Sequence, residues 1–411
     1  MDILKGNAII SQSGGPTAAI NATLSGVIRG CLECEDKIAT LYGAKNGVEG
    51  LLREDIVDLS SFFKGNEDKL SLLESTPASA LGSCRLRLPT PEKDREIYDK
   101  LFAILNKLNI KYFFYIGGND SMDTVNKLHS FAVSNGQNIK FIGVPKTIDN
   151  DLVCTDHTPG YGSAAKYIAT SMEEILRDCG VYTVKSVTVV EIMGRDAGWL
   201  TLASSLAGMH NGKEVDLIYL PEKTFSIEEF IESVKKKLED HPDVVVAVSE
   251  GIRYASGRYV CEGTTDNKKD AFGHKFLSGT AKQLTHIVAG ELGCKTRAIE
   301  LNVLQRCAGH IQSACDIDES VMIGKEAVYQ ALSGKSGIML IFEREDGEYK
   351  TKIAAVDVSR VANNVKFVPD EFINEKGNGV TSKAREYLLP LIKGERYVEY
   401  KDGLPVHCII K

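Results

Sequence analysis

The sequence predicts an α/β fold built from two doubly wound α/β domains with mainly parallel sheets that face a cleft. Short apolar, β-branched segments alternate with longer amphipathic segments along most of the 411 residues. The short segments are apolar throughout, which is typical of parallel strands covered by helices on both faces. There are more of them than one compact sheet usually holds, so two sheets are expected.

Nine segments are predicted as strands. They are Ala8–Ser11, Ala39–Tyr42, Tyr112–Ile116, Phe141–Val144, Val187–Ile192, Leu217–Leu220, Val244–Val248, Arg297–Leu304 and Ile338–Phe342. The predicted helices are Ala18–Leu32, Asp120–Ala132, Ser163–Arg177, Ile227–Leu238, Thr280–Leu292 and Glu319–Leu332. Right-handed crossovers in such a fold place functional loops at the carboxyl ends of the strands.

The chain is expected to pass between the two domains twice. Cys154–Gly162 contains Pro159 and two glycines and is the favoured first crossing, and the return is expected near Cys307–Ala314. This division gives one α/β domain of residues 1–158, completed by about 308–345, and a second of residues 159–307. Residues 346–411 are predicted to be a C-terminal extension packed on the core.

Composition excludes several classes of protein. The formal charge of −7 argues against a nucleic-acid partner, because phosphate backbones require a basic face. No apolar segment approaches the roughly 20 residues of a membrane helix, and the charged start lacks a signal core. Of the ten cysteines only Cys31 and Cys34 form a CxxC pair, so reduced thiols in a cytoplasmic protein are expected.

Three predicted strands end directly in loops that could bind phosphate. Ser13–Thr17 and Gly117–Ser121 each combine glycines with polar residues at the start of a helix, where backbone N–H groups favour anions. A glycine turn or an ordinary N-cap would look the same. Pro145–Asp151 brings a lysine, a hydroxyl and two carboxylates together. Phosphoryl transfer to an alcohol needs a cation for phosphoryl oxygens and a carboxylate for the hydroxyl proton.

Two other motifs are excluded. Gly334-Lys335-Ser336 resembles the end of a P-loop, but Tyr329 stands where the first glycine is required, so a helix C-terminal turn is predicted. The glycine-rich turns lack the G-x-G-x-x-G pattern and the later acidic residue of a dinucleotide-binding dehydrogenase. The eight histidines show no metal-site spacing.

The loops occur in an order that resembles the phosphofructokinase family. The motifs are Gly82-Ser83-Cys84-Arg85, Gly117-Gly118-Asn119-Asp120-Ser121, Pro145-Lys146-Thr147-Ile148-Asp149-Asn150-Asp151, Met193-Gly194-Arg195 and Ser249-Glu250-Gly251. The resemblance covers about residues 5–345. Val365–Glu395, with Val368-Pro369 and Gly377–Thr381, resembles the tail of a longer, largely pyrophosphate-using branch.

The resemblance implies a role for each matching residue. Asp149 takes the proton from the 1-hydroxyl of fructose 6-phosphate, and Lys146 and Thr147 bind the phosphoryl group. The implied sugar-phosphate residues are Asp151, Met193, Gly194, Arg195, Glu250 and Arg306, with Arg297 reaching a neighbouring subunit; the implied donor residues are Gly14, Gly15, Arg85, Gly118, Asn119 and Asp120. The first domain would thus bind the donor and the second the sugar phosphate.

Two positions depart from the family pattern. Many members have His or Tyr at the position of Val303, so that sugar contact is missing or replaced, with His310 as the candidate. A second inter-subunit arginine aligns with Ser186, and Lys185 is the candidate for its role. An inter-subunit contact implies a homodimer or homotetramer.

The donor is predicted from Asp120 and Lys146. ATP-using members have glycine at the position of Lys146, although some have lysine there, and they have glycine at the position of Asp120, which leaves room for the α-phosphate. An aspartate there fills the space, and one unit-charge repulsion at about 4 Å and an effective dielectric near 20 is about 4 kcal/mol. This weakens ATP binding roughly a thousandfold. Pyrophosphate is therefore the expected donor, with Mg²⁺ held by Asn119, Asp120, Asp149 and Asp151.

Two alternatives stay open at this point. An ATP-dependent 6-phosphofructokinase would use the same fold and acceptor. A non-catalytic subunit that only binds sugar phosphate would be marked by loss of the base or the phosphate arginines, and Asp149, Arg195 and Arg306 are all present.

Overall fold

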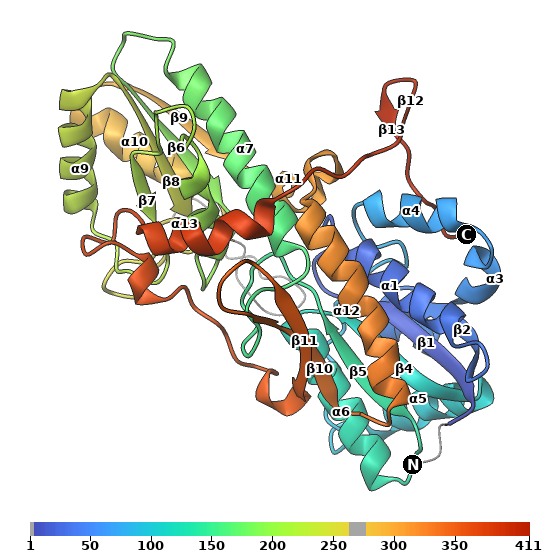
Figure 1. Cartoon of the computed structure of the whole chain (residues 1–411). Helices are drawn as coiled ribbons and strands as arrows, with labels where there is room; N and C mark the ends of the chain where they lie inside the picture. Colours follow the sequence, from blue (N-terminus) through green and yellow to red (C-terminus); the bar gives the residue numbers. More distant parts are fainter. Residues whose placement is uncertain (1–3, 263–276) are drawn as a thin grey trace.

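The computed structural model describes residues 4–262 and 277–411 and has a mixed α/β fold with two separate main sheets (Figure 1). The larger sheet has the strand order β11-β10-β5-β4-β1-β2-β3, and the smaller has the order β7-β8-β6-β9. Within the described residues, only the β2–β3 and β10–β11 pairs of these two sheets are antiparallel. The predicted fold class is confirmed.

The larger sheet is made mainly by the first 145 residues. Its strands are β1 (Gly6–Gln12), β2 (Ile38–Ala44), β3 (Ile56–Asp58), β4 (Ile110–Gly117), β5 (Lys140–Pro145), β10 (Ile338–Arg344) and β11 (Thr351–Asp357). Its helices are α1 (Ile20–Glu33), α2 (Gly47–Leu52), α3 (Leu59–Phe63), α4 (Glu67–Ser75), α5 (Arg95–Lys107), α6 (Asn119–Ser134) and α12 (Ala314–Leu332). Strand β4 lies near the centre and is buried almost throughout, because helices cover both faces.

Helices α1 and α12 approach each other so closely that glycine is required on both. A Cβ at Gly26 would lie 2.1 Å from the carbonyl oxygen of Val321, and one at Gly324 would lie 2.2 Å from that of Thr23. Neither contact is possible without moving backbone. This packing fixes the start of α1, directly after the predicted Ser13–Thr17 loop.

The smaller sheet lies at the other end of the molecule (Figure 1). Its strands are β6 (Ser186–Ile192), β7 (Leu217–Tyr219), β8 (Asp243–Ser249) and β9 (Lys295–Glu300), and its helices are α7 (Tyr161–Cys179), α8 (Trp199–Leu202), α9 (Ile227–Asp240) and α10 (Thr280–Leu292). The valines of β6 and β8 are fully buried in it. The predicted helices therefore all occur, with ends displaced by a few residues.

One predicted strand is wrong in its second half. Arg297–Leu304 was expected to be a strand, but β9 ends at Glu300 and a short helix, α11 (Leu304–Cys307), follows. Asn302 adopts a left-handed φ of 46°, and its carbonyl oxygen accepts a hydrogen bond from Gln305 Nε2 at 2.9 Å. This turn replaces an extended backbone and directs Arg306 inward.

The C-terminal segment contacts both halves of the molecule. Strand β11 is the antiparallel edge of the larger sheet, whereas helix α13 (Ser382–Leu388) packs beside α7 and the smaller sheet (Figure 1). A short hairpin of β12 (Tyr400–Lys401) and β13 (Leu404–Pro405) follows. Residues 346–411 are thus partly a strand of the large sheet and partly a cover for the small one. The division at 158, 307 and 345 stays a prediction.

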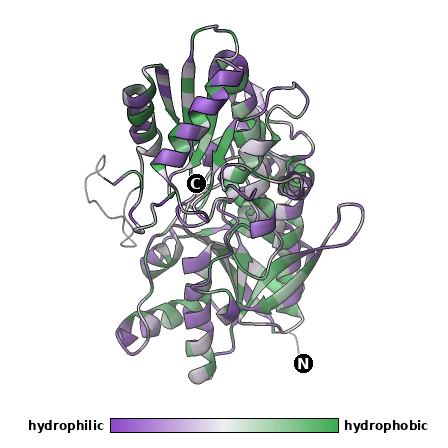
Figure 2. Ribbon diagram, turned by 90° about the vertical axis from the view of Figure 1, so that its left-hand side faces the viewer, coloured by the Kyte–Doolittle hydropathy of each residue, from purple (hydrophilic) through white to green (hydrophobic). Residues whose placement is uncertain are grey.

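Hydropathy follows the layers of the fold. Hydrophobic residues gather in the sheets, and the outer helices present hydrophilic faces (Figure 2). Across residues 4–262 and 277–411, no helix combines the length and the apolar character that spanning a bilayer would require. Gly334 adopts a φ of 94° just after α12, so the Gly334-Lys335-Ser336 motif is a helix C-terminal turn, as predicted.

Candidate active site

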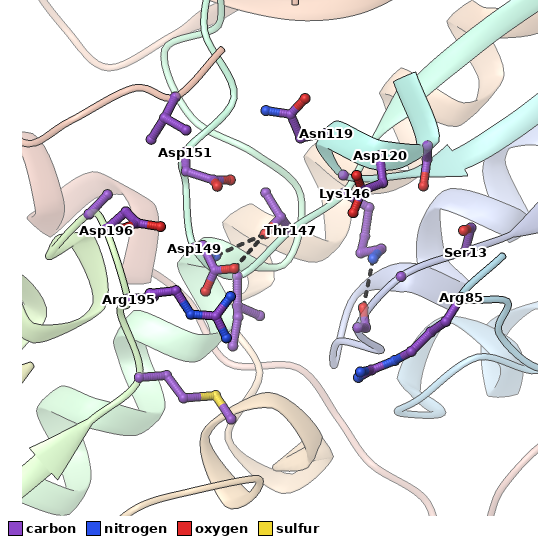
Figure 3. A pocket seen from close by; sticks show the side chains of 18 of the residues that line it. Ser13, Arg85, Asn119, Asp120, Lys146, Thr147, Asp149, Asp151, Arg195 and Asp196 are labelled. Carbon is purple, nitrogen blue, oxygen red and sulfur yellow. Dashed lines mark hydrogen bonds between the residues drawn. The ribbon is translucent and has the colours of Figure 1, made fainter. Parts of the chain in front are cut away.

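The carboxyl ends of strands from both sheets line one cavity of about 510 Å³ (Figure 3). The larger sheet contributes the loops after β1, β4 and β5, and the smaller sheet those after β6 and β8. Its polar lining residues are Ser13, Arg85, Arg87, Asn119, Asp120, Ser121, Thr124, Lys146, Thr147, Asp149, Asp151, Arg195, Asp196, Glu250, Arg306 and Asn363. Cations and carboxylates therefore face the same space.

A second cavity of about 360 Å³ adjoins the first. The two share Arg85, Met193, Arg195, Glu250 and Arg306 as lining residues. Its other lining residues come from the smaller sheet, the turn after β9 and the residues before α10, and they are Glu191, Ile192, Leu277, Ser278, Glu300, Asn302, Val303 and Gln305. The cavities together form an elongated site with arginines at the boundary.

The structure brings nearly all of the predicted site residues together. Every one of them lines the first cavity except Arg297 and Lys185. Arg297 instead forms an ion pair of 2.8 Å with Asp178, and Lys185 is exposed at the start of β6. Both lie outside this chain's own cavity, and their predicted roles toward a second subunit stay predictions.

The loop after β5 holds the predicted base. The Asp149 backbone N–H donates to Thr147 Oγ1 at 3.1 Å, and the Thr147 hydroxyl donates to Asp149 Oδ2 at 3.4 Å (Figure 3). The Thr158 hydroxyl donates to the Thr147 carbonyl at 2.7 Å. Burial raises the pKa of Asp149, and burial together with the Asp149 charge raises the pKa of Asp151 to about 7. These carboxylates are more basic than ordinary ones.

Lys146 joins this loop to the glycine turn after β1. Its ammonium donates to the Gly15 carbonyl at 2.6 Å, and the residue is only 1% exposed. Burial lowers the pKa of Lys146 to about 8, although Asp149 acts in the opposite direction. An anion in the cavity would stabilise the charged form.

The turn after β6 is built around Gly194 and Glu250. Gly194 has a φ of 145°, and a Cβ there would lie 2.5 Å from Ser249 Oγ. Its N–H lies 3.5 Å from Glu250 Oε1, and the Ser249 hydroxyl donates to its carbonyl at 2.6 Å. Burial, with Asp149 nearby, raises the pKa of Glu250 to about 8. The carboxyl group is thus suited to hydrogen-bond a neutral hydroxyl.

Asn119 is held by the C-terminal segment. Its Nδ2 donates to the Asn364 carbonyl at 2.6 Å, and its Oδ1 accepts from the Asn363 backbone N–H. The oxygen predicted to bind a metal therefore already accepts a hydrogen bond. In the part of the chain that the structure describes, no three His, Cys, Asp or Glu side chains gather closely enough to hold a metal ion.

Several lining residues were not predicted. Asp196 directly follows a predicted motif and Arg87 lies two residues after another, so neighbourhood could have suggested them. Asn363 precedes, and Val365 begins, the C-terminal segment that resembles the pyrophosphate-using branch, but neither was predicted as a site residue. Val303 lines the second cavity, whereas His310 lines neither of the two cavities.

A cavity between two α/β sheets that is lined by a buried lysine, arginines and carboxylates fits a phosphotransferase that acts on an alcohol. The chain belongs to the phosphofructokinase family, because the sequence model of that family, described as Phosphofructokinase, matches residues 7–345.

Known relatives agree over nearly the full length. A pyrophosphate–fructose 6-phosphate 1-phosphotransferase of Halomonas elongata is 40% identical over 402 residues, which cover 97% of this chain and 94% of that protein. The crystal structure of a pyrophosphate-dependent phosphofructokinase from Nitrosospira multiformis has a TM-score of 0.87 and 38% identity, covering 97% of this chain and 95% of that one. The corresponding Marinobacter aquaeolei structure has a TM-score of 0.86 and 38% identity, covering 98% and 95%.

Proposed function

We propose that this enzyme transfers a phosphoryl group from pyrophosphate to the 1-hydroxyl of fructose 6-phosphate, giving fructose 1,6-bisphosphate and phosphate. The observation that supports it most is the convergence of Asp149, Lys146 and Asp120 on one cavity that also meets the sugar-side arginines. Relatives named for this reaction are similar over nearly the whole chain.

Asp149 is the proposed general base. It removes the proton of the 1-hydroxyl while that oxygen forms a bond to phosphorus and the bridging P–O bond of pyrophosphate breaks. Thr147 fixes the carboxylate by its hydrogen bond, and Lys146 neutralises charge on the phosphoryl oxygens. A raised pKa matches the base to a proton that is hard to remove.

The donor follows from charge and space in the cavity wall. Asp120 lines the cavity at the start of α6, where ATP-using members of the family have glycine. A carboxylate there repels the α-phosphate of ATP, whereas pyrophosphate has only two phosphates and does not reach this carboxylate. The free-energy change of phosphoryl transfer from pyrophosphate to the sugar phosphate is small, so the reaction should run in both directions.

Magnesium is proposed to bind between the protein and the donor. The cavity offers hard oxygen ligands from Asp120, Asp149 and Asp151 without a complete protein cage, which fits an ion that keeps substrate phosphates and waters in its shell. The ion would neutralise charge on the phosphates. The hydrogen bond that Asn119 Oδ1 already accepts makes it the weakest candidate ligand.

The sugar 6-phosphate is assigned to Arg306 and to residues of a second copy. Arg306 lies at the boundary of the two cavities, and Arg297 and Lys185 lie outside this chain's own cavity, where they could serve a partner's. The active unit is therefore proposed to be a homodimer or homotetramer. Sedimentation at the assay concentration tests this, and a fully active monomer would contradict it.

Product analysis tests the function. The protein, fructose 6-phosphate, pyrophosphate and magnesium should yield fructose 1,6-bisphosphate and phosphate in equal amounts, and the reverse mixture should form pyrophosphate. Turnover only with ATP would favour the ATP-dependent alternative. A folded, pure sample that binds fructose 6-phosphate but turns over with neither donor would favour the non-catalytic alternative.

A further inference from the structure

Lys366 is a residue of the C-terminal segment whose ammonium hydrogen bonds all go to the loop that bears Asp149. Its ammonium donates to the carbonyl of Asp156 at 2.8 Å, the carbonyl of Thr155 at 3.1 Å and Asn150 Oδ1 at 3.3 Å. Three acceptors satisfy the three donors of an ammonium. A lysine held so completely is unavailable to substrate.

The same residue also binds that loop through its backbone. The Lys366 N–H donates to the carbonyl of Asp151 at 2.7 Å. Together the four bonds join positions 150–151, next to the predicted base, to positions 155–156, where the chain turns toward the smaller sheet. One residue thus fixes both ends of the loop's second half.

The loop needs such external support because its backbone is irregular. Asn150 and Cys154 have left-handed φ values of 52° and 68°, which non-glycine residues adopt at a cost. Residues 146–160 contain no helix or strand to supply a regular ladder of hydrogen bonds. Tyr387 adds a second contact, accepting from Asn150 Nδ2 at 2.9 Å and donating to the Asp156 carbonyl at 2.8 Å.

Lys366 is itself anchored from two sides. Trp199 Nε1, at the start of α8 beside the smaller sheet, donates to the Lys366 carbonyl at 2.8 Å, and the ammonium lies 4.9 Å from the centre of that ring. On the donor side, the Asn119 side chain binds the backbone at 363 and 364. The segment 363–366 therefore connects the donor loop, the catalytic loop and the sugar-side half.

We propose that Lys366 is a positioning residue for phosphoryl transfer, which holds the Asp149 loop in its reactive geometry from the C-terminal segment. The inference rests on the proposed function, since it assigns Asp149 as base. Lys366 does not line the first cavity or the second, so its removal should change the chemical step more than substrate binding.

The test compares Lys366→Met and Lys366→Arg with Lys383→Met. Lys383 lies in the same C-terminal segment but makes only an exposed ion pair with Glu371, so it is a matched control. Lys366→Met should lower kcat by roughly tenfold to a hundredfold, because small displacements of reacting groups have effects of this size. KM for fructose 6-phosphate should stay within about twofold of the wild-type value. A defect in substrate binding would instead change KM. Lys366→Arg should restore part of kcat, and Lys383→Met should behave as wild type.

A spectroscopic readout accompanies the kinetics. Trp199 is the single tryptophan of the chain, and it contacts Lys366 directly, so its emission should change in Lys366→Met and not in Lys383→Met. An unchanged kcat in Lys366→Met would overturn the inference. Equal losses of kcat in Lys366→Met and Lys366→Arg that are explained by their lower melting temperatures alone would also overturn it. An inactive wild type in the same assay would instead refute the proposed function. If Lys366→Met does not fold, Lys366→Gln replaces it, with the same split expected.

Discussion

A group of buried ionisable residues lies near each end of the loop of residues 146–160. Their pKa values shift against the charged form in one group and toward it in the other. At one end, the cavity carboxyls of Asp149, Asp151 and Glu250 have raised pKa values and Lys146 a lowered one, because burial dominates. At the other end, the Asp156–His157–Glu319 cluster favours charge on every member.

The difference lies in the partners each group finds. Burial would lower the pKa of His157, but Glu319 at 2.8 Å and Asp156 at 2.9 Å raise it to about 9. Arg344 donates to Asp156, and Tyr349 and Thr351 donate to Glu319. His157 also stacks on Phe342 with ring centres 4.7 Å apart. The fold itself supplies the counter-charges here.

The cavity carboxylates have fewer protein partners, so their charges are costly in the folded protein without ligand. A phosphate, a cation or a hydroxyl would complete their hydrogen bonds and relieve that cost. In these two groups the direction of the pKa shift therefore reflects whether the fold supplies counter-charges to the buried residues.

Replacing the base gives the largest expected effect. Asp149→Ala should lower kcat by at least about a hundredfold, since a positioned general base contributes roughly 10²–10⁴. Its melting temperature should be equal to or above that of wild type, because the buried carboxylate is unfavourable in the folded protein. Steady-state kinetics and thermal unfolding measure both. A near-normal rate would remove the assigned role of Asp149.

A substitution in the Asp156–His157–Glu319 cluster should lower the stability of the fold, which substitution of Asp149 should not. Glu319→Gln leaves His157 without one of its two carboxylates, and breaking a buried ion pair costs about 3 kcal/mol or more of stability. Urea unfolding should show this. The control is Glu371→Gln, because the exposed ion pair of Glu371 with Lys383 contributes under about 1 kcal/mol to stability. Equal midpoints for both variants would contradict the distinction between the two regions.

The pH profile of kcat/KM should report the cavity groups. Activity should rise as Asp149 and Asp151 lose protons, with Asp151 having a pKa of about 7, and fall as Lys146 loses its proton near pH 8. Lys146→Arg should move the alkaline limb upward, because arginine stays charged. A profile flat between about pH 6 and pH 9 would contradict the assignment.

Much of the fold and of the candidate site could be predicted from the sequence. Parallel strands buried on both faces give uninterrupted apolar segments, so β4, β5, β6 and β8 were recognised, and the loops at their carboxyl ends contain most of the cavity residues. Strand β11 was missed because one edge strand of mixed burial, with the sequence TKIAAVD, gives a weak signal.

Other features depend on contacts between distant segments. Nothing near Asn119 indicates that Asn363 and Asn364, some 244 residues later, bind its side chain. Lys366 and Val365 lie at the start of the segment that resembles the pyrophosphate-using branch, but their place beside the Asp149 loop follows from how the C-terminal segment crosses the fold. Such positions are set by packing and are invisible to local pattern.

The most direct measurement is the initial rate with fructose 6-phosphate and magnesium, comparing pyrophosphate with ATP at equal concentration in wild type and Asp120→Gly. Wild type should be active with pyrophosphate alone, and Asp120→Gly should gain the use of ATP, because the substitution removes charge and bulk from the cavity wall. Wild-type activity with ATP alone would contradict the account of the donor.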